Sequence, residues 1–155
     1  MNEKLKILLE SVKDKYDFVA DADNTLDGKA AALMGFEITL FIGYLSLVIA
    51  GIGDSIKFGE GVAGLVGLGV SIALLLRVNW PKQYTAISVD LFEHQDYLSK
   101  TEDDLLLQLV SDAQNAFTEN NKTLGKKAKL YKIAIALLII SSVLLVLSKV
   151  AKFYV

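Results

Sequence analysis

The chain has 155 residues, a formal net charge of −2 and a 53% share of hydrophobic residues, with a mean hydropathy of +0.43. A soluble domain of this length is usually about 45–50% apolar and has no long uncharged runs. The absence of cysteine excludes disulfides, thiolate metal sites and a cysteine nucleophile. A single histidine argues against a histidine metal site or a Ser-His-Asp triad. We therefore expect a protein that is not an enzyme and has no catalytic residues, metal or cofactor.

The N-terminal segment, residues 1–29, is predicted to be a cytoplasmic amphipathic helix. Within residues 3–20, apolar side chains recur at spacings of three and four, which is the pattern of a helix with one apolar face. The stripe consists of Leu5, Leu8, Leu9, Val12, Tyr16 and Val19. It must bury against other helices or lie in the membrane interface. Residues 21–28 are acidic and turn-rich, which predicts a break before the first membrane helix.

Three apolar runs predict an all-α integral membrane protein with three transmembrane helices and a cytoplasmic helical bundle. Residues 30–53 contain one ionisable side chain and exceed the roughly 20 residues that a helix needs to cross the bilayer. Residues 61–76 form the second run, which Val78 and Trp80 extend to an interfacial anchor. The third run, residues 133–147, continues into the C-terminal tail. The predicted parts are a transmembrane hairpin at 30–78, a cytoplasmic helical region at 79–131 and a third membrane helix at 132–155.

Local signals place the helix ends between these runs. Residues 54–60 are predicted to be a short polar loop. Pro81 is suited to the first position of the next helix, and Thr101, followed by three acidic residues, to the N-cap of another. Gly125 is expected to weaken that helix without ending it.

The distribution of lysine and arginine predicts the orientation of the chain. Segments 1–29 and 77–132 carry five and eight of these residues, which is 13 of the 16 in the chain. With three membrane helices, both segments lie on one side, and the positive-inside rule makes that side cytoplasmic. We expect the N-terminus inside and the C-terminus outside.

Glu37 is the first candidate for function, because an ionisable group within a membrane helix is costly and usually has a role. One interpretation is a ring of carboxylates, one per protomer, that lines or gates a pore. The other is an acid that is paired with Arg77, Lys29 or Lys132 near the interface.

Three glycines of the second run, Gly61, Gly64 and Gly67, share a helix face, whereas Gly69 lies on another. Small residues let membrane helices approach closely. The face therefore indicates tight packing against the first membrane helix or a second protomer, with pore lining as the alternative.

A basic cluster precedes the third run and contains Lys122, Lys126, Lys127, Lys129 and Lys132. Such lysines commonly bind anionic lipid headgroups. The alternative is a polyanion site for a nucleotide or oligonucleotide, with Tyr131, Phe117 or Tyr84 as stacking surfaces.

The arrangement resembles small membrane effectors of bacterial antiphage systems: the SLATT-type proteins, the transmembrane effector of Pycsar and the membrane component of Hailong. The stretches that carry the resemblance are DNTLDGKAAALMGF at 23–36 and DDLLLQLVSDAQNAFTENNKTLGKKAKLYK at 103–132. It implies an inner-membrane channel or membrane-disrupting effector that a nucleotide-derived signal switches in order to stop the growth of infected cells. Likeness to Hailong implies a homo-oligomeric ion channel controlled by an oligodeoxyadenylate that a partner nucleotidyltransferase makes.

Two functions remain open at the level of sequence. The first is a ligand-gated homo-oligomeric channel, with a tetramer favoured, in contact with membrane lipid. Its ion selectivity is open, because lysines at the inner mouth favour anions and a Glu37 ring favours cations. The second is a non-conducting anchor or scaffold that recruits a cytoplasmic partner through its amphipathic helices.

Overall fold

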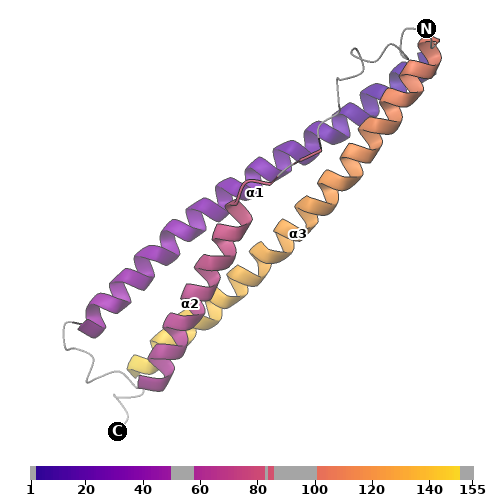
Figure 1. The fold of residues 1–155 in the computed structure, drawn as a ribbon. Helices are drawn as coiled ribbons and strands as arrows, with labels where there is room; N and C mark the ends of the chain where they lie inside the picture. The colour runs from indigo at the N-terminus through magenta and orange to yellow at the C-terminus, as the bar shows by residue number, and fades with distance from the viewer. Residues whose placement is uncertain (1–2, 50–57, 83, 86–100, 151–155) are drawn as a thin grey trace. The chain divides into compact units, whose positions relative to one another are not determined.

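The computed structural model describes residues 3–49, 58–82, 84–85 and 101–150, and these form three helices. They are α1 (Glu3–Ile49), α2 (Phe58–Asn79) and α3 (Glu102–Val150), and the described residues contain no strand (Figure 1). Each helix is long and apolar enough to cross a membrane. The prediction of an all-α protein with three membrane-spanning helices is therefore confirmed.

The predicted break at residues 21–28 is wrong, because α1 continues through this segment as one helix of 47 residues. The segment is acidic and contains Gly28, so its intrinsic helix propensity is low. Tertiary contacts outweigh that propensity: Leu26 packs against an apolar cluster, and Asp27 forms an ion pair with α3.

Pro81 does not begin a helix, contrary to expectation. Helix α2 ends at Asn79, and residues 81, 82, 84 and 85 are not helical. Residues 86–100, which include the single histidine, His94, lie outside the described residues, as do residues 54–57 of the predicted polar loop.

The start of α3 follows the sequence signals. The Asp104 N–H donates to the Thr101 hydroxyl oxygen at 3.3 Å, and that hydroxyl donates to the Asp104 carboxylate at 2.6 Å. The Leu105 N–H donates to the Thr101 carbonyl oxygen at 3.1 Å. Thr101 is thus the N-cap, as predicted. Gly125 lies inside α3 without ending it, which confirms the expectation.

The chain divides into two compact units. Unit 1 comprises Met1–Thr25 and Pro81–Lys126, and unit 2 comprises Leu26–Trp80 and Lys127–Val155. In unit 1, Val12 of α1 packs against Val110 and Ala113 of α3. Val19 is also buried. This side of the predicted amphipathic stripe therefore packs against a helix of the same chain.

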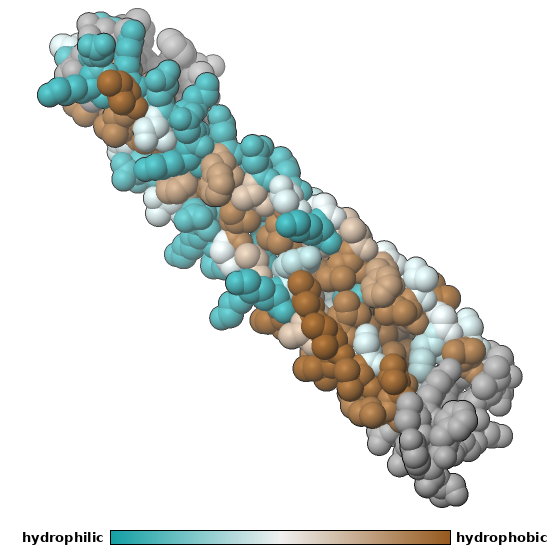
Figure 2. Space-filling view, turned by 180° about the vertical axis from the view of Figure 1, so that it is seen from behind, coloured by the Kyte–Doolittle hydropathy of each residue, from teal (hydrophilic) through white to brown (hydrophobic). Residues whose placement is uncertain are grey.

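Unit 2 contains the apolar membrane segments. Its core cluster joins Ala30 of α1, Leu75 and Val78 of α2, and Ala134 of α3. Much of its surface is apolar, and Figure 2 shows hydrophobic side chains gathered over one part of the visible face. Exposed residues of this kind include Phe36, Ile42, Val66, Leu76, Ile139, Val143 and Val146. Such a surface suits contact with lipid or with another membrane helix.

Buried residues on α1 and α3 recur at intervals of seven, the repeat that keeps one face of each helix toward its partner. On α1 they are Asp23, Ala30, Glu37 and Tyr44. On α3 they are Ala113, Asn120, Lys127, Ala134, Ser141 and Ser148. More than half of them are polar, so hydrogen bonds and ion pairs must stabilise the contact along with apolar packing.

The glycine face of α2 packs against α3. A Cβ atom at Gly64 would lie 2.6 Å from Leu145 Cδ2 and 3.2 Å from the Ser141 carbonyl oxygen. One at Gly67 would contact the Ser141 hydroxyl. A Cβ atom at Gly69 would meet nothing within 4 Å. The close approach therefore joins the second and third membrane helices, whereas the sequence indicated the first helix or another protomer.

We expect Gly64→Ala to destabilise the protein by about 1–3 kcal/mol, because the added methyl group has no room against Leu145 and the α3 backbone. Gly69→Ala is the matched control and should be neutral or stabilising by up to about 1 kcal/mol. Thermal unfolding of the detergent-solubilised variants measures both. Equal losses at the two positions would contradict the α2–α3 contact.

Candidate functional site

Glu37 lies at the point where the three helices of unit 2 meet. Its side chain is 0% exposed. The Ser71 hydroxyl of α2 lies 2.9 Å from Glu37 Oε1 and also 2.9 Å from the Ala134 carbonyl oxygen of α3. One serine therefore bridges a carboxyl group on α1 and the backbone of α3.

The proton count of this network limits the bonds that the Ser71 hydroxyl can make. A serine hydroxyl carries one proton, so it can donate to Glu37 or to Ala134 but not fully to both. Glu37 Oε2 is also buried, and none of the described residues forms a hydrogen bond with it.

None of the cations that the sequence suggested as partners for Glu37 forms an ion pair with it in the described part of the chain. Arg77, Lys29 and Lys132 are all exposed. Sequence reasoning missed Ser71, although a signal was present. Ser71 is the single hydroxyl-bearing residue in the apolar run 61–76, and a buried hydroxyl group needs a partner.

Lys127 differs from the other members of the predicted basic cluster. Its side chain is 2% exposed, and its Nζ donates to both carboxylate oxygens of Asp27, at 2.8 and 2.9 Å. Lys122, Lys126, Lys129 and Lys132 remain exposed on α3. The structure thus separates one lysine, which joins α3 to α1, from four that are available to lipid headgroups or a polyanion.

The aromatic residues near this cluster also separate into two groups. Tyr131 is partly buried against the apolar cluster of Ala30 and Leu75, which limits its use as a stacking surface. Tyr84, in contrast, lines a pocket in unit 1.

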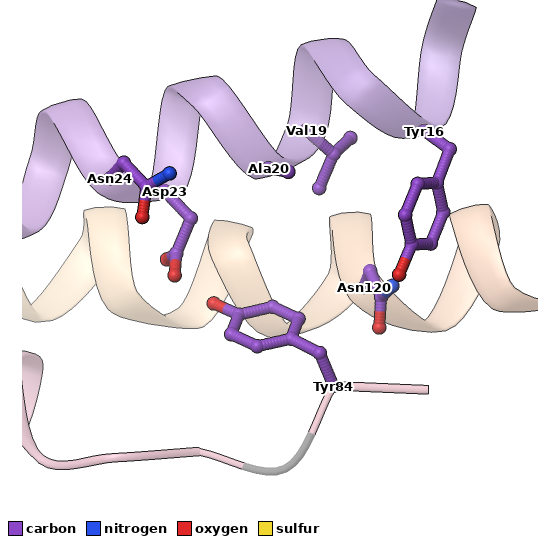
Figure 3. Close-up of a pocket in the computed structure, with 7 residues that line it drawn as sticks. All are labelled: Tyr16, Val19, Ala20, Asp23, Asn24, Tyr84 and Asn120. Atoms are coloured by element: carbon purple, nitrogen blue, oxygen red, sulfur yellow. The ribbon is translucent and has the colours of Figure 1, made fainter. Parts of the chain in front are cut away.

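That pocket encloses about 180 Å³ and is the second candidate site (Figure 3). Tyr16, Val19, Ala20, Asp23 and Asn24 line it from α1, Tyr84 from the segment after α2 and Asn120 from α3. The Asp23 carboxylate and the hydroxyl end of Tyr84 point toward one another, while Tyr16 stands at the other end beside Asn120. The pocket thus combines two aromatic rings with one carboxylate and two amides.

Asn120 fixes the segment that carries Tyr84. Its Oδ1 accepts from the Thr85 N–H at 2.9 Å, and its Nδ2 donates to the Thr85 carbonyl oxygen at 3.0 Å. The Thr85 hydroxyl also donates to Glu119 at 2.6 Å. The side-chain amide thereby holds the backbone next to Tyr84 at two points, which positions one wall of the pocket.

Among the residues that the structure describes, no three His, Cys, Asp or Glu side chains are close enough to hold a metal ion. The carboxyl group of Glu37 has the Ser71 hydroxyl and, through it, the Ala134 backbone carbonyl near it. The polar contacts of Glu37 can hold the helices in position relative to one another.

The Asp27–Lys127 pair yields a prediction. Asp27→Ala should destabilise the protein by about 3 kcal/mol, because it leaves the lysine ammonium group buried without this partner. The double variant Asp27→Leu/Lys127→Met should recover most of that loss, since two apolar side chains leave no buried charge that needs a partner. Thermal unfolding in detergent measures the stability of these variants relative to the wild type. Additive losses in the double variant would show that the pair does not couple α1 to α3.

Comparison with known proteins identifies a family. The family model of the Pycsar effector protein domain matches residues 14–152. No curated protein and no solved structure matches the chain. The match covers all three helices except the start of α1, and it agrees with the resemblance that the sequence indicated. The chain belongs to the Pycsar effector family and is a multi-pass membrane effector of antiphage defence.

Proposed function

We propose that this effector is a homo-oligomeric ion channel that a nucleotide signal opens, and that its opening depolarises the membrane and arrests growth. The observation that carries the proposal is Glu37, a fully buried carboxyl group within the membrane helices. Its contact with Ser71 is a local interaction that a conformational change can break. Pycsar effectors respond to cyclic nucleotide signals, which supports a nucleotide as the trigger.

Conduction requires several copies of the chain. Three membrane helices are too few to surround a water-filled pore, so the pore forms around a symmetry axis, with a tetramer as our working stoichiometry. The exposed apolar side chains of all three helices in unit 2 support such contacts. The small hydroxylic positions Thr39 and Ser46 bond to their own helix, so they leave no polar group to be satisfied by lipid.

The burial of Glu37 supports a resting conformation for this structure. A carboxyl group that lines a pore must meet water, but here it meets Ser71 and lies against α2 and α3. We infer that this conformation is closed, and that opening moves α2 away from α1 and α3. The movement takes Ser71 from both of its partners at once and exposes Glu37.

The direction of the helices supports the orientation we expect. In unit 2, Asp27 pairs with Lys127 and Tyr44 bonds to Ser148, so residue numbers rise in the same direction along α1 and α3. Parallel helices enter the membrane from the same side. This agrees with a cytoplasmic N-terminus, a cytoplasmic segment 77–132 and an outer C-terminus.

Exposed charged residues would determine which ions pass through the pore. The lysines at positions 122, 126, 129 and 132 favour anions at the inner mouth, whereas a ring of exposed Glu37 side chains favours cations. Arg77, which is exposed at the end of α2, adds positive charge.

Ion flux from liposomes tests the proposal. We expect the wild type to release K⁺ or Cl⁻ when a nucleotide is added, in a panel of the four 3′,5′-cyclic mononucleotides and an oligodeoxyadenylate. Ser71→Ala should raise flux without ligand severalfold, because it removes the bridge to Glu37 and Ala134. Glu37→Gln should keep basal flux low, because the amide can still form a hydrogen bond with Ser71.

Ser46→Ala is the matched control, since its hydroxyl is exposed and bonds within α1. It should behave as the wild type does. Flux that stays absent in every variant and with every ligand would exclude the channel and favour a non-conducting anchor that recruits a cytoplasmic partner.

A further inference from the structure

We propose that the pocket of unit 1 binds a nucleobase, and that the carboxylate of Asp23 selects a base with an exocyclic amino group. This inference rests on the proposed function, because it assigns the site at which the nucleotide signal acts. It differs from a site on the exposed lysines, which would recognise phosphate and not the base.

The apolar part of the pocket suits the faces of a planar heterocycle. Its volume of about 180 Å³ is enough for a base, and its walls include Val19, Ala20 and the rings of Tyr16 and Tyr84 (Figure 3). Bases bind proteins by stacking on aromatic side chains and by hydrogen bonds along their edges. Both kinds of group are present here.

The polar part of the pocket determines which base fits. Asp23 is 7% exposed and lies on α1. An ionised carboxylate can only accept hydrogen bonds, so it favours a base edge that donates. Cytosine, adenine and guanine carry an amino group, whereas uracil has a carbonyl oxygen at the position of the cytosine amino group. The same carboxylate repels phosphate, so the base and not the phosphate occupies this part of the pocket.

The pocket is also placed to act on α2. Tyr84 lies five residues beyond the end of α2 at Asn79, and Asn120 holds the adjoining Thr85 at two points. A base that stacks on Tyr84 contacts the segment directly connected to α2, the helix that carries Ser71. Asn120 is a positioning residue here, since it orders the wall that Tyr84 provides.

Equilibrium binding to the full chain in detergent tests the inference. Isothermal titration calorimetry with the 3′,5′-cyclic monophosphates of cytidine, adenosine, guanosine and uridine should show at least one amino-bearing nucleotide binding roughly tenfold to a hundredfold more tightly than the uridine nucleotide. Asp23→Asn should reduce that preference to a fewfold, because an amide presents a donor as well as an acceptor. Asn120→Ala should weaken the binding of every nucleotide without changing the preference among the bases.

Two further variants guard against loss of folding. Asp21→Asn, an exposed carboxylate on the same helix, should bind as the wild type does. Ala20→Leu fills the pocket without altering its charges and should abolish binding. Wild-type protein that binds none of the four, binding that survives both Asp23→Asn and Ala20→Leu, or equal affinity for all four bases would overturn the inference.

These outcomes are separable from those of the flux experiment. Nucleotide binding that requires the pocket, without ion flux, would refute the channel and leave the pocket assignment standing. Nucleotide-driven flux that is unchanged in Asp23→Asn and Ala20→Leu would refute the pocket and leave the channel standing.

Discussion

The structure depends on one constraint: a polar group inside a membrane helix must find its partner within the protein, because lipid offers none. Glu37 meets this constraint at one oxygen, Oε1, through Ser71, which also reaches the Ala134 carbonyl oxygen. A single hydroxyl group therefore connects α1, α2 and α3 at one level. Close approach of α2 to α3 at Gly64 and Gly67 brings the serine within reach. Hydrogen bonds depend on register more strictly than apolar contacts do, so this network favours the observed register.

Polar side chains also find partners within the protein at other positions along the α1–α3 contact. The Tyr44 hydroxyl lies 2.9 Å from Ser148 Oγ, and the serine donates to the Leu145 carbonyl at 2.7 Å, so the tyrosine is the donor of the pair. Lys127 and Asp27 form an ion pair in the same unit. Polar residues at a seven-residue repeat fix the register of paired helices at some expense in stability. Under the proposed function, a contact of this kind suits the resting state, because it is specific and not overly strong.

Much of the fold could be predicted from the sequence, since apolar run length and charge distribution are local properties. The three membrane helices and the N-cap at Thr101 follow from such signals. The continuous helix through residues 21–28 could not be predicted, because it depends on contacts of Leu26 and Asp27 with residues about 100 positions later. For the site, Glu37 was recognisable as an ionisable group in a membrane helix. Its partner was not, because charge favoured Arg77 and only the packing of α2 places Ser71 beside it. The division of the lysines into a buried Lys127 and four exposed ones also requires the structure.

The most direct test of this account uses the absence of cysteine from the chain. A Cβ atom at position 67 would lie 3.4 Å from Ser141 Cβ, close to the separation in a disulfide. The variant Gly67→Cys/Ser141→Cys should therefore cross-link within one chain on mild oxidation, and the cross-link should abolish nucleotide-driven ion flux until a reductant restores it. Failure to cross-link, cross-linking between chains, or full flux from the cross-linked protein would contradict a closed state in which α2 is held against α3 and must leave for the channel to open.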